Sequence, residues 1–241
     1  MSLDARGGYV NPAQIEVQPG RSIDRIMTLP TPTKGNPHSV RPLFIDWFTT
    51  PTTGGRRIRY HSIAPNYNMT IFARWSDPNV HLPLWWPPAY SGTTTIPLRL
   101  HYGQRSDRWQ SNIRRAINNW NNSSANVEFD ARSNAIRQND VFIENRHDRW
   151  LGLCLPLGWR GSNITSFEIV LNANQIYSEA NSGWLSSYGL DTIITWVMAH
   201  ELGHAVGLQD QFGTTDSVMS NSTPRVTPSS FDINNVNIIY G

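Results

Sequence analysis

The sequence predicts an α+β fold, in which a β-rich N-terminal region (residues 1–92) precedes a domain of mixed strands and helices (residues 93–241). Three observations lead to this prediction. Short stretches that alternate polar and apolar residues, or are rich in β-branched and aromatic residues, recur along the chain. Two longer segments, which end near residues 120 and 205, carry the marks of helices. A run of Ser, Gly and Thr at 91–94 is typical of a boundary.

The N-terminal region is predicted to contain strands between long loops, and to form either a small β-rich module or a wrap on the following domain. Residues 1–40 are rich in Pro and Gly, which interrupt regular structure, so we expect mostly loop there. The strands that we expect cover 14–17, 43–48, 57–60 and 69–75, and 43–48 pairs with 57–60 as a hairpin around the turn at 52–55.

Trp85 and Trp86 lie next to each other among prolines and allow two interpretations. They form either an aromatic surface that binds a sugar or a peptide, or a clamp that packs the N-terminal part onto the rest of the chain. We favour packing, because aromatic side chains mostly supply buried area. His61 and His81 are isolated in the sequence, so we expect ordinary histidines there rather than metal ligands.

The second region begins with a predicted strand at 96–102, followed by a helix that Ser106 caps. Five apolar residues recur along this helix at helical spacing and predict that it packs on a sheet. Asp191 is expected to cap a second long helix, and a third helix is expected to start at 229–233. The apolar stripe of the first helix consists of Trp109, Ile113, Ala116, Ile117 and Trp120. Further strands are expected at 127–129, 141–144, 150–156 and 167–172.

Composition excludes several classes of protein. The net charge is +2 and no basic block occurs, so the electrostatic footprint of a nucleic-acid-binding protein is missing. No apolar run is long enough to cross a membrane. Cys154 is the single cysteine, so no disulfide can form within the chain. The N-terminus does not resemble a signal peptide, and we expect a secreted protein whose native leader has been removed.

The segment His200-Glu201-Leu202-Gly203-His204 carries the clearest chemistry. Two histidines four residues apart lie on one face of a helix, so both imidazoles can reach one metal ion. Nitrogen ligands at this spacing suit Zn²⁺. Glu201 lies beside the first ligand and can take a proton from a metal-activated water. The other interpretation, an amphipathic helix with two ordinary histidines, is the less favoured one.

The continuation of the motif predicts a third ligand. Gly207 permits the left-handed conformation that ends a helix, so the chain can turn back. Asp210 then stands where a third ligand is needed, and carboxylate oxygen is an accepted zinc donor. Met219 follows nine residues later.

His200-Glu201-x-x-His204-x-x-Gly207-x-x-Asp210 followed by Met219 resembles the signature of the metzincin zinc metalloproteases. An aspartate as third ligand is similar to the snapalysin-like branch, and the closing helix resembles matrixins. The resemblance covers roughly residues 93–241. It implies a zinc metalloendopeptidase in which Glu201 is the general base, His200, His204 and Asp210 bind zinc, and Met219 lies under the metal.

In this family the substrate polypeptide lies extended beside an edge strand, whose unpaired backbone groups accept an added strand. We expect that edge within residues 151–166, with Gly152, Leu153 and Leu155 as contacts. The loop after Met219 walls the specificity pocket in the family, which makes Asn221 a further candidate.

Three alternatives accompany this interpretation. The metzincin frame could be a catalytically weak scaffold whose N-terminal module binds a polysaccharide or a host protein, or a toxin-like protease with one target. Cys154 could be a latency thiol, although a buried structural thiol fits its position inside the domain better. His147 and Asp148 could form a second metal pair, although a surface loop is the better interpretation.

Overall fold

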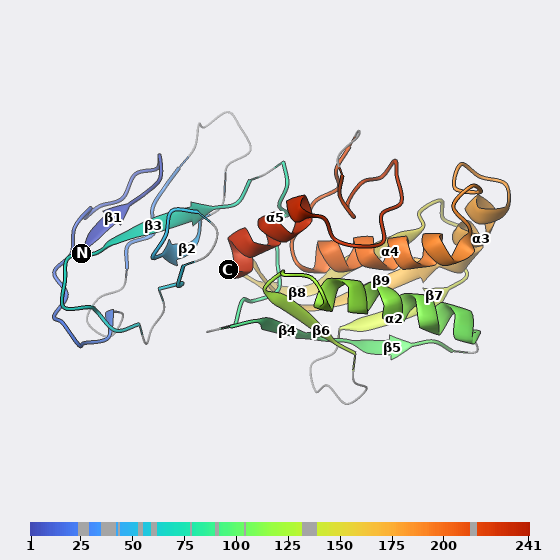
Figure 1. Cartoon of the computed structure of the whole chain (residues 1–241), viewed down its shortest axis with the longest axis horizontal. Helices are drawn as coiled ribbons and strands as arrows, with labels where there is room; N and C mark the ends of the chain where they lie inside the picture. Colours follow the sequence, from blue (N-terminus) through green and yellow to red (C-terminus); the bar gives the residue numbers. More distant parts are fainter. Residues whose placement is uncertain are drawn as a thin grey trace. The chain divides into compact units, whose positions relative to one another are not determined.

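The computed structural model describes residues 1–23, 29–34, 42, 44–52, 55–58, 62–77, 79–89, 92–103, 105–131, 139–212 and 216–241. The fold is α+β, as predicted (Figure 1). The chain forms two compact units. Unit 1 contains Met1–His81 with Asn237–Ile239 and Gly241, and unit 2 contains Leu82–Val236 with Tyr240. Whether residues 1–92 act as a separate module stays a prediction.

Unit 1 is built on a three-stranded sheet in the order β1-β3-β2. β1 (Ser2–Asp4) pairs in parallel with β3 (Thr70–Trp75), and β2 (Phe44–Phe48) pairs with β3 in the antiparallel direction. The β-rich N-terminal region is therefore confirmed. Its core consists of Leu3, Ile15, Ile23, Trp47, Ile58, Ala64, Ile71 and Ala73.

The predicted hairpin is confirmed over the part that the structure describes. The amide of Ile58 donates to the Trp47 carbonyl (2.8 Å), and the amide of Thr49 donates to the Arg56 carbonyl (2.9 Å). Residues 53, 54, 59 and 60 lie outside the described residues, as does His61. The strand predicted at 14–17 is wrong, because this segment makes only an isolated bridge, between Gln14 and Ser2 of β1.

Unit 2 contains a mixed four-stranded sheet in the order β5-β7-β9-β8. β5 (Arg99–His101), β7 (Asp140–Glu144) and β9 (Asn163–Asn172) are parallel, and β8 (Gly152–Arg160) is antiparallel to β9. Among the described strands, β8 therefore forms one edge of this sheet, within the range where an edge was expected.

The single strand predicted at 96–102 is wrong, because the chain changes partner at Leu98. β4 (Thr94–Pro97) pairs with β6 (Val127–Asp130) in a separate two-stranded sheet, whereas β5 pairs with β7. Leu98 itself is fully buried, and its amide donates to the Asp130 carbonyl (2.8 Å).

The first long helix, α2, covers Asp107–Asn121 and buries all five residues of the predicted apolar stripe. It packs against α4 (Leu190–Ala205) and also against β6 (Figure 1). The prediction of a sheet contact was therefore incomplete. Ser106 takes the N-cap position, but its side chain makes no capping hydrogen bond.

The structure corrects the start of α4 and adds a helix before it. The N-cap of α4 is Gly189 (φ 75°), not Asp191, whose carboxylate instead accepts from Arg108 (2.6 Å) and Asn112 (2.7 Å). The added helix, α3 (Ala173–Asn181), begins after Asn172, whose side chain caps it. The predicted C-terminal helix is confirmed as α5 (Ser230–Tyr240).

Trp85 and Trp86 are buried within unit 2, which confirms that they pack rather than form an exposed surface. The Trp85 backbone pairs with Ser162 and Ile164 at the start of β9, and the Trp86 ring meets Phe167 edge-on, with 5.9 Å between ring centroids. These two rings therefore form no exposed surface for a sugar or a peptide. No helix among the described residues is long and apolar enough to span a membrane.

Candidate metal centre

The two histidines of the motif lie one turn apart near the C-terminal end of α4. Their ring centroids are 4.8 Å apart, and the ring planes are nearly perpendicular. Their side chains are 12 % and 17 % exposed, so both rings reach the surface only at their edges. The helix therefore presents two imidazoles side by side, as the spacing of four predicts.

The end of α4 brings Asp210 back to these histidines. Gly207 adopts φ 91°; its amide donates to the His204 carbonyl (2.9 Å), and the Leu208 amide donates to the Gly203 carbonyl (2.9 Å). These two bonds form a Schellman motif, which reverses the chain at a left-handed residue. Gly207 therefore ends the helix as predicted.

Asp210 faces both imidazoles. Its Oδ1 lies 2.9 Å from His200 Nε2 and 3.5 Å from His204 Nε2. One ligand atom from each of the three residues lies within 4.8 Å of the others, so the three could hold a metal ion. Two imidazole nitrogens and one carboxylate oxygen form a donor set that suits Zn²⁺.

The other nitrogen of each imidazole is held by a backbone carbonyl. His200 Nδ1 donates to Val218 O (3.0 Å), and His204 Nδ1 donates to Leu208 O (2.8 Å). Because a carbonyl can only accept, each Nδ1 carries a proton. In a neutral ring Nε2 is then an acceptor, and it faces the Asp210 carboxylate, which is also an acceptor. This contact is favourable only if a cation, either a proton or a metal ion, lies between them.

The pKa shifts describe the same site without metal. The hydrogen bonds from His200 and His204 lower the pKa of Asp210. Burial alone would lower the pKa of His204, but the hydrogen bond to Asp210 and the charge of Glu201 outweigh it, so this pKa is raised. A negative carboxylate thus stabilises positive charge at the His204 imidazole, which is what a cation site requires.

Glu201 lies beside the cluster on the buried side of α4. It is only 4 % exposed, and its Oε2 has no hydrogen-bond partner among the described residues. Burial raises the pKa of Glu201, while the two histidines and a hydrogen bond from the Cys154 backbone act in the opposite direction. A buried carboxylate oxygen without a partner is costly, and a water at the site would complete it.

The strand β8 approaches Glu201 at a glycine. A Cβ on Gly152 would lie 2.5 Å from Glu201 Oε1 and 2.6 Å from Val197 Cγ1. A larger residue at 152 would therefore push the strand or the carboxylate away. The structure thus brings Gly152 to the candidate base, and Leu153 and Leu155 follow it along the same edge strand.

Met219 lies directly beneath the histidine helix and is buried. A Cβ on Gly203 would lie 2.2 Å from Met219 Sδ. The backbone around Met219 also carries Val218 O, which holds His200. The carbonyl of Met219 accepts the Gln211 amide (2.9 Å), so this turn is tied to the segment that follows Asp210.

Sequence reasoning missed the residue that fixes this turn, the fully buried Asp232 of α5. Its carboxylate accepts from Ser217 Oγ, from the Val218 amide (3.0 Å) and from the amide and hydroxyl of Ser229 (2.8 and 2.9 Å). The pair Ser229-x-x-Asp232 has the spacing of a capping box, and that spacing was the available signal.

The remaining candidates lie where their residue types suggest. Asn221 is exposed, and its amide donates to the Gln211 carbonyl (3.3 Å). Burial raises the pKa of the Cys154 thiol well above its usual value, which fits a structural thiol. His147 and Asp148 are exposed in a loop between β7 and β8. His81 is buried, and its Nδ1 accepts the Asp77 amide (2.9 Å).

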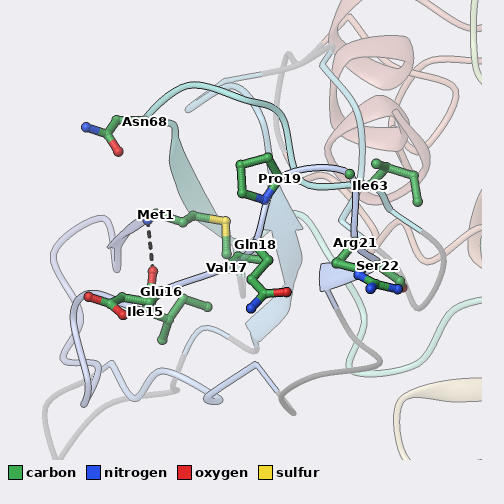
Figure 2. A pocket seen from close by; sticks show the side chains of 11 residues that line it. Met1, Ile15, Glu16, Val17, Gln18, Pro19, Arg21, Ser22, Ile63 and Asn68 are labelled. Atoms are coloured by element: carbon green, nitrogen blue, oxygen red, sulfur yellow. Dashed lines mark hydrogen bonds between the residues drawn. The ribbon is translucent and has the colours of Figure 1, made fainter.

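Unit 1 contains a groove, which is relevant to the hypothesis that the N-terminal module binds a polysaccharide or a host protein (Figure 2). Residues 15–22 line it together with Met1, Ile63 and Asn68, and the Met1 amino group donates to Ile15 O (2.9 Å) beside it. Its charged lining residues are Glu16 and Arg21. None of the described residues that line it carries an aromatic ring on which a sugar could stack.

A scan against protein-family models gives no match to this sequence, and a search of curated proteins gives none either. Among solved structures, myroilysin is similar at 15% identity, with 67% of this chain and 97% of that chain covered and a TM-score of 0.41. High choriolytic enzyme 1, a hatching enzyme zinc-protease from the medaka fish Oryzias latipes, shows 17% identity, 65% and 94% coverage and a TM-score of 0.40.

A third structure, the GM1-bound form of the ECX AB5 holotoxin, shows 13% identity over 60% of this chain and 69% of that chain, with a TM-score of 0.38. Likenesses of this size identify neither a family nor an activity for this chain.

Proposed function

We propose that this protein is a zinc-dependent metalloendopeptidase of the metzincin type, active on polypeptides outside the cell. The observation that carries the proposal is the position of Asp210 opposite two imidazoles whose Nδ1 atoms are already committed to carbonyls. The motif resemblance supports the same ligand set, and the buried Glu201 next to it supplies a candidate base.

His200 and His204 would hold zinc through Nε2, and Asp210 would hold it through a carboxylate oxygen. When bound, zinc would polarise the peptide carbonyl and make water a better nucleophile. The carbonyls of Val218 and Leu208 keep both rings in the orientation and tautomer that binding requires.

Glu201 is proposed to take the proton of the attacking water and to pass it to the leaving amine. Burial favours both halves of this role, because it raises the pKa of the carboxyl toward the working pH. The adjoining edge of β8 from Gly152 to Leu155 would hold the substrate backbone as an added strand. Asn221 would contact substrate from the loop after Met219.

The test is cleavage of casein or gelatin by Glu201→Gln, with zinc content measured on the same sample. We expect full zinc occupancy and a loss of activity of about 10²–10⁴-fold, the usual contribution of a general base. Glu128→Gln, at an exposed position of β6, is the matched control and should cut like the parent protein. Wild-type activity in Glu201→Gln would remove Glu201 from this role.

The scaffold hypothesis predicts a different result, because the parent protein itself would cut nothing. Among the residues of unit 1 that the structure describes, no observation favours it, and Trp85 and Trp86, on which it depended, are buried in unit 2. Chelator-sensitive cleavage by the parent protein separates the two hypotheses.

A further inference from the structure

Unit 1 contains a cavity of about 440 Å³ whose lining residues all belong to that unit. Three of them are cationic, Arg6, Lys34 and Arg74, and none of the lining residues that the structure describes is acidic. Like charges repel one another, so three cations around one cavity become favourable when an anion joins them. The rest of the lining is mostly apolar and consists of Pro51, Thr52, Ala73, Trp75 and Ile238.

Arg74 supplies positive charge from the buried side of the cavity. It is 4 % exposed, and its guanidinium carbon lies 3.7 Å from the centroid of the Phe48 ring. Its nitrogens donate to the Gly241 carbonyl (3.2 Å) and to the Thr50 hydroxyl (3.3 Å). Burial and the nearby charge of Arg57 lower the pKa of Arg74 to about 10, so this side chain stays charged at neutral pH.

Lys34 is held at the cavity with donors to spare. Its Nζ lies 5.6 Å from the centroid of the Trp75 ring and donates to the Arg6 carbonyl (2.9 Å). The Trp75 indole donates in turn to the Ala5 carbonyl (3.0 Å), so the ring and the ammonium are fixed on the same short segment. An ammonium has three donors, and this bond uses one of them.

Arg6 combines an unusual backbone with an uncommitted side chain. Its φ is 51°, the one positive value among the described residues other than glycine. A left-handed conformation is costly for a residue with a side chain, and such strain clusters at binding sites. Arg6 is exposed, and its guanidinium makes no hydrogen bond or ion pair with the part of the chain that the structure describes.

We propose that this cavity binds an organic anion, in which a carboxylate that Arg6 and Lys34 hold is joined to an apolar or aromatic body. Guanidinium and ammonium donors match carboxylate oxygens, and the apolar lining favours a ligand with an apolar body over an inorganic anion. The cavity volume lies in the usual range of small-molecule sites, about 300–1,000 Å³. A free small acid and the C-terminal end of a peptide share this chemistry. The inference does not depend on the proposed function.

The test is isothermal titration calorimetry of the whole protein at low ionic strength, where charge interactions are least screened. The probes are phenylacetate, its uncharged analogue phenylacetamide, and sulfate. Phenylacetate should bind, and the other two should bind at least about tenfold more weakly, because each lacks one half of the recognised chemistry. Arg6→Gln and Lys34→Gln should each weaken phenylacetate binding by about tenfold.

The matched control is Arg21→Gln, which removes an exposed arginine of unit 1 outside this cavity and should bind like the parent protein. An absence of phenylacetate binding would overturn the proposal. Equal affinity for the acid and the amide would do so too, as would an equal loss of affinity in Arg21→Gln, because nonspecific charge would then explain the binding.

Arg6→Gly separates a binding role from a structural one. Glycine relieves the left-handed strain, so this variant should keep or raise the Tm while it weakens binding as Arg6→Gln does. A lower Tm with unchanged binding would show that Arg6 serves only the fold, and would contradict the proposal.

Lys34 is the single lysine of the chain, so its acetylation by an activated ester can be followed by mass spectrometry. Phenylacetate should slow this acetylation and phenylacetamide should not, whereas equal rates would place the ligand elsewhere and refute the site. N-acetyl-Gly-Phe then distinguishes the two sources of the carboxylate. Tighter binding than phenylacetate supports a peptide end as the ligand, and weaker binding supports a free small acid.

Discussion

Met219 Sδ lies so close beneath Gly203 that a Cβ at residue 203 would stand 2.2 Å from it. Gly203 is one residue before His204, and Met219 is one residue after the carbonyl that orients His200. The small residue in the helix and the long one in the turn therefore fit together, and both histidines depend on that fit.

Gly203→Ala should destabilise the protein by about 1–3 kcal/mol, the usual cost of overpacking a well-filled core. In a Met219→Ala background the same change should be neutral or stabilising, because alanine is the better helix former once the sulfur is gone. Urea denaturation of the two single variants and the double variant measures this coupling. An equal cost of Gly203→Ala in both backgrounds would show that the two residues do not meet.

Asp232→Asn should destabilise unit 2 by about 2–4 kcal/mol, because a buried charged acceptor of several hydrogen bonds is replaced by a group that carries donors of its own. It should also weaken zinc binding, since Val218 both donates to Asp232 and holds His200. Thermal denaturation and a competitive zinc titration measure the two effects. Asp107→Asn, at an exposed position in the first turn of α2, should change stability by less than about 1 kcal/mol.

Asp210→His should keep zinc, because imidazole is also an accepted ligand, whereas Asp210→Ala should lose most of it. An aspartate adds negative charge to the site, so the histidine variant should have a lower pH optimum of cleavage. Elemental analysis after dialysis gives the metal content, and a pH–rate profile gives the optimum. Unchanged zinc in Asp210→Ala would remove Asp210 from the ligand set.

Asp140 predicts how stability depends on pH. Burial alone would raise the pKa of Asp140, but the hydrogen bonds from Arg99 (2.6 and 3.1 Å) and His101 (2.7 Å) outweigh it and lower this pKa. Because the folded-state pKa is depressed, Asp140 stabilises the fold above the unfolded-state value, about 3.9, and this contribution is lost as the pH falls further.

Asp140→Asn should therefore flatten the fall of Tm with pH below about pH 4 and lower Tm at neutral pH. Scanning calorimetry from pH 3 to 7 on both proteins gives the comparison. Parallel Tm curves for the variant and the parent would contradict the assignment.

The sequence was most informative where local pattern decides structure. The apolar stripe of α2 and the histidine motif on α4 follow from helical spacing, and the end of α4 follows from the left-handed conformation of one residue, Gly207. Such features lie within one or two turns of the chain, so they could be predicted. The edge position of β8 could be predicted only through the family resemblance.

The predictions that were wrong or incomplete concern features that depend on contacts between residues far apart in the sequence. The break at Leu98 depends on the separate partners of β4 and β5, which no local pattern reveals. Asp191 is of a residue type that often caps helices, but the N-cap position of α4 is taken by Gly189. The Asp191 carboxylate instead accepts hydrogen bonds from Arg108 and Asn112. Asp232 showed a local capping signal, whereas its contact with Ser217 and Val218 exists only in the fold.

Zinc binding by His200, His204 and Asp210 is tested by anomalous scattering at the zinc absorption edge, measured on crystals grown with one equivalent of zinc. We expect one strong peak at about 2.0–2.2 Å from His200 Nε2, His204 Nε2 and an Asp210 carboxylate oxygen. A map without a peak between these three atoms, with His200 Nε2 still hydrogen-bonded to Asp210, would overturn this assignment.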